Sequence, residues 1–205
     1  MNGRPMLDWL IESLTHAEGL QGIVLATSVQ ASDDAVAEYA ARAGIACHRG
    51  PLYDVARRLL GTVRAITADA LVRISGDSPL LDPTVVSQAV RLFREGKADI
   101  VSNVRPRSFP KGQSVEVIAT TALQRAVSAM DSDYDREHVT PYLYAHPDAF
   151  PLRSFQAERP QPDLQLSVDD ETDFRRAEMI LAALDRPHWS AGWETMAALS
   201  QQVAA

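Results

Sequence analysis

Short apolar runs alternate with segments of helical periodicity along the first half of the chain. The strand-like runs, rich in aliphatic and β-branched residues as buried strands are, are residues 22–27, 45–48 and 70–74. The segments with apolar side chains three and four positions apart, which predict amphipathic helices, are residues 5–14, 33–43 and 53–65. Strands that alternate with helices form parallel βαβ units, so the pattern predicts a three-layer, doubly wound α/β domain with a mostly parallel sheet.

The second half of the chain has a more mixed pattern, which predicts some antiparallel pairing. Strands are expected at residues 99–103, 115–118, 152–155 and 164–168. Helices are expected at residues 84–94, at 120–130 with Thr120 as the cap, after Asp170, and in the tail at 189–203. The segment 133–147 has helical character but contains Pro141, which predicts a break there. No linker or repeat divides the 205 residues, so we expect one domain.

The stretch RISGDSPLLDP, residues 73–83, joins a predicted strand to a predicted helix through an acidic loop. Asp77 follows the strand at its carboxyl end, where open α/β sheets bind their ligands. Asp82 is a favourable N-cap, and Pro83 suits the first helical position. Asp77 is therefore a candidate ligand-binding or metal-binding residue, although Asp also commonly closes a turn after Gly.

Composition and motifs exclude several classes of protein. The net charge of −7 argues against a general nucleic-acid binder, which needs a basic face to neutralise phosphates. The lone Cys47 cannot form an internal disulfide, and the apolar runs are too short to span a bilayer, so a cytoplasmic protein is expected. The sequence has no GxGxxG, GxxxxGK[ST] or GxSxG motif and no zinc-type Cys/His spacing, which disfavours dinucleotide oxidoreductases, P-loop kinases, serine hydrolases and zinc proteins.

Two acidic sites at predicted strand ends remain, namely Asp77 and the pair Asp169-Asp170. Two carboxylates from separate strands suit Mg²⁺, which takes one or two protein carboxylates together with substrate phosphates and water. Capping of the following helix explains Asp170, with Asp173 as its capping-box partner. Asp169 is less needed for capping and is the better candidate ligand.

Five stretches in this order resemble the cytidylyltransferases of the spore-coat polysaccharide and acylneuraminate type, and more distantly the 3-deoxy-manno-octulosonate cytidylyltransferases. The stretches are RISGDSPLLDP, DIVSNV, FPKGQSVEV, YDREHVTPYLY and LSVDDETDF. The resemblance extends from Gly3 to about Leu184. It implies a fold of the nucleotide-diphosphosugar transferase type. It also implies transfer of a cytidylyl group from CTP to a sugar hydroxyl, with Mg²⁺ and release of pyrophosphate.

The resemblance also implies roles for matching residues. Asp77 and Asp169 correspond to the metal-binding carboxylates, which counter the negative charge that builds at the α-phosphate by holding the metal there. Arg73 is expected to help place the nucleotide. The expected substrate-binding residues are Glu116, Arg136, Glu137, His138, Arg105 and Arg107. A structural helix histidine remains an alternative for His138, and solvated side chains remain one for the two loop arginines.

The segment 105–150 is expected to face the sugar and to mediate a homodimer. It carries many apolar and aromatic groups around a Pro-broken helix, which would be unfavourable if exposed. These residues are Tyr134, Val139, Tyr142, Leu143 and Tyr144.

The match departs from the family at the beginning of the sequence. Family members begin with a strand and an Arg- and Lys-bearing loop that wraps the triphosphate, and residues 1–6 here correspond to the end of that loop. Lys111 and Ser114 also stand where relatives usually carry acids. We therefore expect weak CTP binding and poor turnover or none. We also expect either two unpaired sheet edges or direct pairing of the runs at 22–27 and 70–74.

Two alternative functions remain open at this point. One is a non-catalytic homologue that serves as a sugar- or partner-binding dimeric subunit. The other is a generic α/β nucleotide-sugar binder or hydrolase that uses Mg²⁺ at Asp77.

Overall fold

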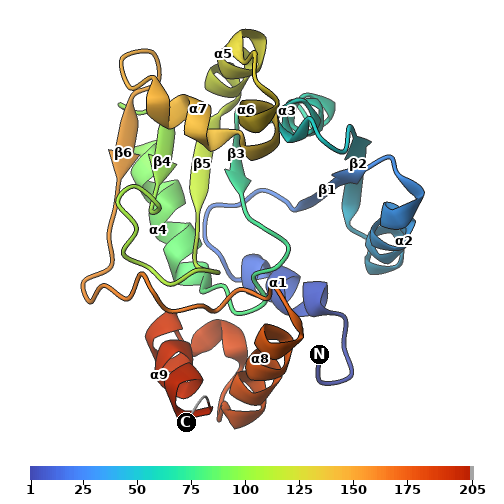
Figure 1. Ribbon diagram of the computed structural model, residues 1–205, viewed down its shortest axis with the longest axis vertical. Coiled ribbons are helices and arrows are strands. Elements are labelled where there is room, and N and C mark those ends of the chain that lie inside the picture. Colours follow the sequence, from blue (N-terminus) through green and yellow to red (C-terminus); the bar gives the residue numbers. More distant parts are fainter. Residues whose placement is uncertain (204–205) are drawn as a thin grey trace.

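Strands and helices alternate from α1 through β4, as the sequence pattern predicts, in a computed structural model that describes residues 1–203 (Figure 1). The strands are β1 (Val24–Ser28), β2 (Ala46–Gly50), β3 (Ala70–Arg73), β4 (Ile100–Ser102), β5 (Glu116–Ala119) and β6 (Leu152–Ser154). The α-helices are α1 (Met6–Thr15), α2 (Asp34–Ala43), α3 (Val55–Ala65), α4 (Pro83–Arg94), α5 (Thr120–Ala129), α6 (Asp133–His138), α7 (Thr140–Ala145), α8 (Glu171–Ala183) and α9 (Trp193–Val203). The short 3-10 helices are η1 (Ala31–Asp33) and η2 (His188–Ser190).

The larger sheet has the strand order β3-β5-β4-β6. Strand β5 runs antiparallel to both β3 and β4, whereas β4 and β6 are parallel. Strands β3, β4 and β6 therefore share one direction, and their carboxyl ends meet the beginning of β5 at one edge of the sheet. This edge, which we call the carboxyl edge, faces α8 and α9 in Figure 1. The α/β class and the expected antiparallel pairing in the second half are confirmed.

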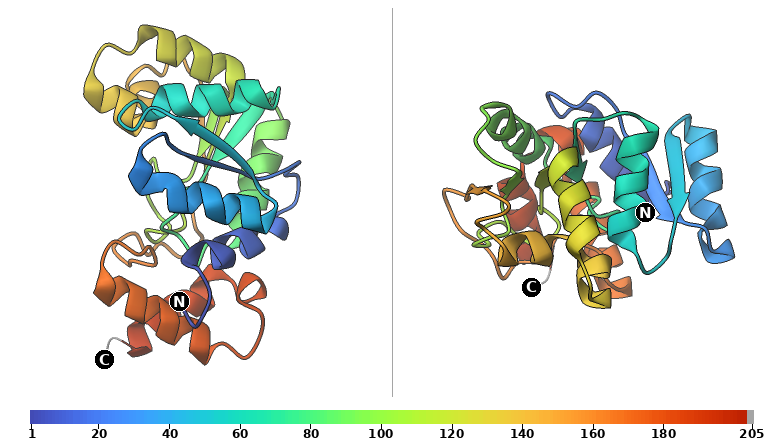
Figure 2. Two further views of the ribbon diagram at one scale, coloured as in Figure 1. Left: turned by 90° about the vertical axis from the view of Figure 1, so that its right-hand side faces the viewer. Right: turned by 90° about the horizontal axis from the view of Figure 1, so that it is seen from above.

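Helices cover both faces of this sheet, because neighbouring strand residues point to opposite sides. Val101 and Val117 pack with α4 in one apolar cluster, whereas Ile100 and Ile118 pack with α3 and α5 in another. Figure 2 shows α3 and α4 on opposite sides of β3. A third cluster joins α8 and α9 to Leu80 of the loop after β3. The three-layer arrangement is thus confirmed, and the third cluster places the C-terminal helices beside the carboxyl edge.

Strands β1 and β2 form a separate parallel pair. Within residues 1–203, β1 pairs only with β2 and β3 pairs only with β5, so β1 and β3 each have one unpaired edge. The alternative of direct pairing between the runs at 22–27 and 70–74 is not formed. All of β3 and the first three residues of β1 are only half-buried, although their apolar sequences predict full burial. The reason is geometric, because each strand has a neighbouring strand on one side only.

Several element boundaries follow the predicted capping residues. The Asp82 carboxylate accepts a hydrogen bond from the Thr84 N–H at 2.8 Å and caps α4, with Pro83 in the first helical position. The helix α2 ends at Gly44, whose φ of +68° is the left-handed conformation that glycine adopts without strain.

The structure corrects three local expectations. The break in the segment 133–147 falls at Val139 and not at Pro141, because Pro141 occupies the first turn of α7, where its missing N–H is not needed. Residues 164–168 do not form a strand, since they make only an isolated bridge between Gln165 and Lys111. Thr120 begins α5 as its first residue and is not its cap, because its hydroxyl donates to the Ala68 carbonyl at 2.6 Å.

The sequence predicts a dimer because five apolar and aromatic residues would be unfavourable if exposed. Four of these five residues are buried or half-buried in the monomer. Val139 and Leu143 are fully buried in the monomer, and Tyr142 and Tyr144 are half-buried. Only Tyr134 is largely exposed, at 61%. The homodimer therefore stays a prediction that rests on the resemblance alone. None of the helices within residues 1–203 combines the length and apolar character that crossing a membrane requires.

One buried histidine predicts a pH dependence of stability. The His188 Nε2 donates to the Trp9 carbonyl at 2.8 Å and so ties η2 to α1. Burial lowers the pKa of His188 below its usual value, even though this hydrogen bond acts in the opposite direction. As the pH falls below about 6.5, the unfolded chain gains a proton at this position that the folded protein resists. The free energy of unfolding should therefore decrease from pH 7.5 to pH 5.5 in urea titrations.

His188→Gln should weaken this pH dependence, because glutamine can still donate to the Trp9 carbonyl but does not titrate in this range. His146→Gln is the matched control, since His146 is exposed. Equal pH dependence in the wild type and His188→Gln would contradict the prediction.

Candidate active site

The two acids predicted to hold a metal belong to adjacent segments at the carboxyl edge. Asp77 lies in the loop after β3, and Asp169 lies just before α8. The Val168 N–H donates to the Asp77 carbonyl at 2.8 Å, so the neighbour of one acid is hydrogen-bonded to the backbone of the other. Asp77 is half-buried and Asp169 is exposed. The structure therefore brings together two residues that lie far apart in the sequence.

The hydrogen bonds of these carboxylates fit a metal-binding role. Asp77 Oδ1 accepts from the Ser78 hydroxyl at 2.9 Å, and Asp169 Oδ2 accepts from the Gln165 amide at 2.9 Å. Among residues 1–203, the second oxygen of each carboxylate has no protein donor. In the same range, no group of three or more His, Cys, Asp or Glu residues could hold a metal ion. Two carboxylates are a donor set that an ion such as Mg²⁺ accepts, because it takes its remaining ligands from substrate and water.

Helix capping is performed by the residues after Asp169, as the sequence predicts. Asp170 Oδ1 accepts from the Asp173 N–H at 2.9 Å at the beginning of α8. The Asp173 carboxylate accepts from the Asp169 N–H at 3.0 Å and pairs with Arg176. Burial alone would raise the pKa of Asp173, but these two contacts outweigh it and hold the pKa below its usual value. Capping therefore does not occupy the Asp169 side chain.

A second loop closes on the segment that carries Asp169. The Lys111 N–H donates to the Leu164 carbonyl at 2.9 Å, and the Leu166 N–H donates back to the Lys111 carbonyl at 2.8 Å. Gly112 has a φ of +89°, and a Cβ there would lie 2.6 Å from the Ser167 nitrogen. The close approach of the two backbones therefore requires glycine at this position.

Buried Glu116 and half-buried Arg73 form an ion pair beside this loop. They lie opposite each other in the β3–β5 register, with Arg73 Nη1 2.6 Å from Glu116 Oε2. The other oxygen of Glu116 accepts from the Tyr144 hydroxyl, which also lies 2.8 Å from the Ser102 hydroxyl. Burial, followed by the Glu116 charge, raises the pKa of Tyr144. The buried charge of Glu116 thus has its partner within the chain, and the pairing fixes the orientation of Arg73.

Two further arginines lie near this network with little compensating charge. The Arg105 guanidinium lies 5.1 Å from the centre of the Tyr144 ring, and Arg107 Nη1 donates to the Ser114 hydroxyl at 3.1 Å. Neither arginine has a carboxylate within ion-pair distance among residues 1–203. Glu116 thus neutralises Arg73 alone, and the charges of Arg105 and Arg107 leave a local excess of positive charge.

The three predicted residues on α6 are arranged differently. Arg136 Nη1 lies 3.1 Å from Asp54 Oδ2, at the beginning of α3, and its Nη2 donates to the Met130 carbonyl at 2.6 Å. Arg136 thus holds α6 against α3 and is not engaged with the Asp77–Asp169 pair. Glu137 and His138 are both exposed, and the His138 ring packs edge-on against Tyr134 with 4.4 Å between ring centres. The alternative of a buried structural histidine does not apply to His138.

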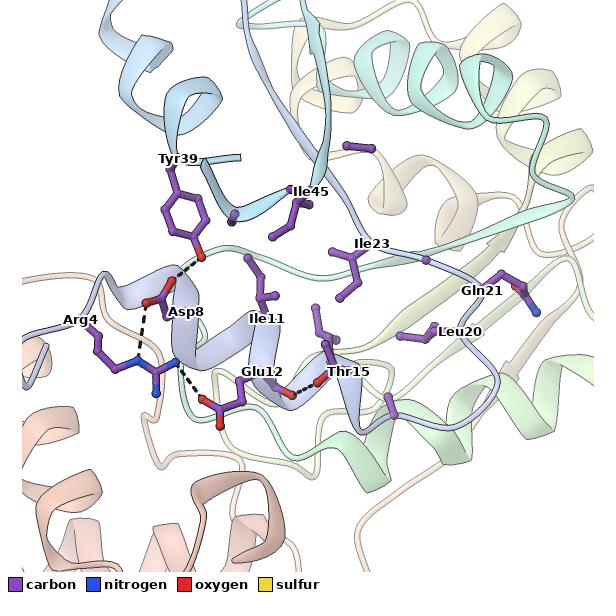
Figure 3. A pocket seen from close by; sticks show the side chains of 16 residues that line it. Arg4, Asp8, Ile11, Glu12, Thr15, Leu20, Gln21, Ile23, Tyr39 and Ile45 are labelled. Atoms are coloured by element: carbon purple, nitrogen blue, oxygen red, sulfur yellow. Dashed lines mark hydrogen bonds and ion pairs between the residues drawn. The ribbon is translucent and has the colours of Figure 1, made fainter. Parts of the chain in front are cut away.

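A cavity of about 850 Å³ lies elsewhere, between α1 and the beginnings of β1 and β2 (Figure 3). Its apolar wall includes Ile11, Leu20, Ile23 and Ile45, and the Tyr39 hydroxyl donates to Asp8 Oδ1 at 2.6 Å at its rim. None of the predicted site residues lines this cavity. Ile23, the residue just before β1, borders this cavity. The cavity does not coincide with the carboxyl edge of the larger sheet.

Sequence reasoning missed the fully buried Gln113, although the motif FPKGQSVEV contains it. The Gln113 side chain accepts from the Asp82 N–H at 2.9 Å and donates to the Leu80 carbonyl at 2.6 Å. A polar residue between the apolar Phe109 and Val115 was the available signal, but its partners follow only from the fold.

Comparison with known proteins defines the class of this chain. The family model described as cytidylyltransferase matches residues 1–203, so the chain belongs to the cytidylyltransferase family. The fold is similar to that of a solved cytidylyltransferase from Leptospira borgpetersenii, on which the chain superposes with a TM-score of 0.90. That comparison has 22% sequence identity and covers 98% of this chain and 85% of the other.

Two relatives and one further solved structure are also similar to this chain. The chain is 31% identical over 179 residues to an uncharacterised protein of Methanocaldococcus jannaschii, covering 85% of this chain and 72% of the relative. It is 25% identical over 195 residues to the spore coat polysaccharide biosynthesis protein SpsF of Bacillus subtilis, covering 91% and 80%. A Mycobacterium tuberculosis structure in complex with manganese matches with a TM-score of 0.61 and 17% identity, covering 90% and 89%.

The close backbone contact at Gly112 gives a stability prediction. Gly112→Ala and Gly44→Ala both place a Cβ at positive φ, which costs about 1–2 kcal/mol. Only Gly112→Ala also forces an overlap with the backbone of residues 166–167, which adds roughly 1–3 kcal/mol. Urea unfolding should therefore show a larger loss for Gly112→Ala, because no atom lies within 4 Å of the Cβ position at Gly44. Equal losses in the two variants would contradict the predicted overlap.

Proposed function

We propose that this chain transfers a cytidylyl group from CTP to a hydroxyl of an acidic or surface-polysaccharide sugar and releases pyrophosphate. Membership of the cytidylyltransferase family supports CTP-dependent nucleotidyl transfer. The observation that carries the proposal is the hydrogen bond from Val168 to Asp77, which places the Asp77 and Asp169 segments side by side.

Asp77 and Asp169 would hold a divalent cation, for which we propose Mg²⁺. Each side chain has a carboxylate oxygen without a protein donor among residues 1–203, and a related fold has been solved with manganese. Such an ion supplies positive charge that stabilises the phosphate oxygens during transfer. The protein contributes by fixing both carboxylates on backbones that are hydrogen-bonded to each other.

The arginines provide the second part of the proposal. Arg73 is oriented by Glu116 and would contact the nucleotide from the edge of β3. Arg105 and Arg107 carry charges without a carboxylate partner in the described chain, so they would bind an anionic sugar. A guanidinium pairs well with a carboxylate because it can present two parallel N–H donors. The excess of positive charge in an otherwise acidic protein favours an acidic sugar over a neutral one.

The exposed side chains of Glu137 and His138 are proposed to contact the sugar from α6, with Arg136 as the residue that holds this helix in place. These contacts derive from the family resemblance, so they are expected only if this chain binds the same kind of sugar as its relatives. A cytoplasmic homodimer is proposed on the same basis.

The unpaired strand edges favour a second candidate function. Unpaired backbone groups on β1 and β3 can accept a further strand, which is a common mode of protein recognition. A non-catalytic subunit that binds a sugar or a protein partner would use the same fold without turnover. Pyrophosphate release by the 205-residue chain with CTP, Mg²⁺ and a panel of acidic sugars would exclude the second function, because a non-catalytic subunit releases none.

Asp77→Asn should abolish divalent-cation-dependent CTP binding and reduce any pyrophosphate release by on the order of a hundredfold or more. The amide keeps the size of the side chain but removes the negative charge that the cation needs. Calorimetric titration of CTP with and without Mg²⁺ measures binding, and thermal unfolding should be nearly unchanged. Asp148→Asn is the control, since this exposed acid lies in the loop before β6. Normal cation-dependent binding by Asp77→Asn would show that the metal site lies elsewhere.

Arg107→Gln should raise the KM for an acidic sugar about tenfold, which corresponds to the loss of one charge-assisted contact. The KM for CTP should change little, and glutamine can still donate to Ser114. If the chain does not turn over, the dissociation constant of the sugar replaces KM. Arg91→Gln on α4 removes the same charge from an exposed surface position and serves as the control. An unchanged affinity for the acidic sugar in Arg107→Gln would remove Arg107 from the proposed site.

A further inference from the structure

We infer that Gln113 is a positioning residue that sets the spacing between Asp77 and Asp169. This inference rests on the proposed function, because it assumes that these two acids hold the divalent cation. The side chain of Gln113 is fully buried and contacts neither carboxylate, so it would act through the loop that carries Asp77.

The loop between β3 and α4 has few hydrogen bonds of its own. Within it, the Leu81 N–H donates to the Ser78 carbonyl at 3.2 Å, and the Ser78 hydroxyl donates to the Asp77 carboxylate. The remaining anchors come from other segments. Val168 binds the loop at Asp77, and Gln113 binds it at both Leu80 and Asp82. The Trp193 N–H at the beginning of α9 also donates to the Asp82 carboxylate at 2.9 Å. The position of Asp77 is thus fixed from both sides by residues outside the loop.

Two of these external anchors, Val168 and Gln113, belong to a single unit. The paired hydrogen bonds between Lys111 and residues 164–166, with the close approach at Gly112, join the Gln113 loop to the Asp169 segment. Gln113 is further fixed by its own carbonyl, which accepts from the Asn103 amide at 2.7 Å. Asp169 and Gln113 are therefore mounted on one support, and the Asp77 loop is attached to that support at two places.

Removal of the Gln113 amide would free one of these two attachments. The Leu80 carbonyl and the Asp82 N–H would lose their partners in a region where both residues are almost fully buried. The loop would then be attached to the support that carries Asp169 only through Val168, while Trp193 still binds its far end at Asp82. The Asp77 carboxylate would therefore sample a wider range of positions relative to Asp169. A cation that takes only two protein ligands is sensitive to their spacing, and so its affinity should decrease.

The test compares the affinity for Mn²⁺, measured by electron paramagnetic resonance, in four proteins at a temperature well below unfolding. These are the wild type, Asp77→Asn, Gln113→Leu and Ile118→Ala. Ile118 lies in the core beneath α3 and α5, so its truncation destabilises the fold without touching the Asp77 loop. Hydrogen exchange of residues 78–82 is followed in the same samples. If Gln113→Leu does not fold, Gln113→Met, which keeps the length and flexibility of the side chain, takes its place.

The expected result is a dissociation constant for Mn²⁺ at least tenfold higher in Gln113→Leu, with faster exchange of residues 78–82. Ile118→Ala should change neither quantity. Wild-type Mn²⁺ affinity in Gln113→Leu, with binding lost in Asp77→Asn, would overturn this inference and leave the proposed metal site intact. Equal Mn²⁺ binding, or none, in the wild type and Asp77→Asn would overturn the proposed metal site and this inference with it.

Discussion

The hydrogen bond between the Val168 N–H and the Asp77 carbonyl is the contact on which the candidate active site depends. It joins residue 77, in the loop after β3, to residue 168, which lies 91 positions later in the chain. A backbone hydrogen bond constrains position more tightly than a contact between long side chains, because few rotatable bonds separate it from the residues it fixes. The two candidate metal ligands consequently lie on supports that cannot move independently.

Near this contact, the buried carboxylate of Asp82 is stabilised by backbone N–H donors and not by a cationic side chain. Asp82 is only 3% exposed and has no cationic partner among residues 1–203, yet its two oxygens accept from the Thr84 and Trp193 N–H groups. These donors belong to the first turns of α4 and α9, where the helix dipole favours a negative charge. One carboxylate therefore serves two helix ends, and it links the C-terminal helix to the loop that carries Asp77.

Strands β1 and β2 form a pair that is separate from the larger sheet. No strand lies between β1 and β3 in the described chain, and the apolar residues of both strands are left half-buried. Strands β5, β4 and β6 nevertheless form a regular carboxyl edge, because that part of the molecule packs against α4 and the C-terminal helices. The acids and the arginine network can therefore be organised while one edge of β3 stays unpaired.

The sequence by itself determined the elements and the residue types of the site. Periodicity identified α1 through β4, because each element is specified by local apolar spacing and by caps such as Asp82 and Gly44. The division between Asp170 as a cap and Asp169 as an available acid was also predictable, since capping depends on neighbours within one turn. The family motifs then indicated which acids and arginines to consider.

Only the tertiary structure decided which of these residues meet. The pairing of Arg73 with Glu116 depends on the register between β3 and β5, and the engagement of Arg136 with Asp54 depends on the docking of α6 against α3. The burial of Val139 and Leu143 and the role of Gln113 likewise arise from contacts between segments distant in the sequence. Local spacing carries no information about such contacts, because strand order and helix docking are set by how the whole chain buries its apolar surface.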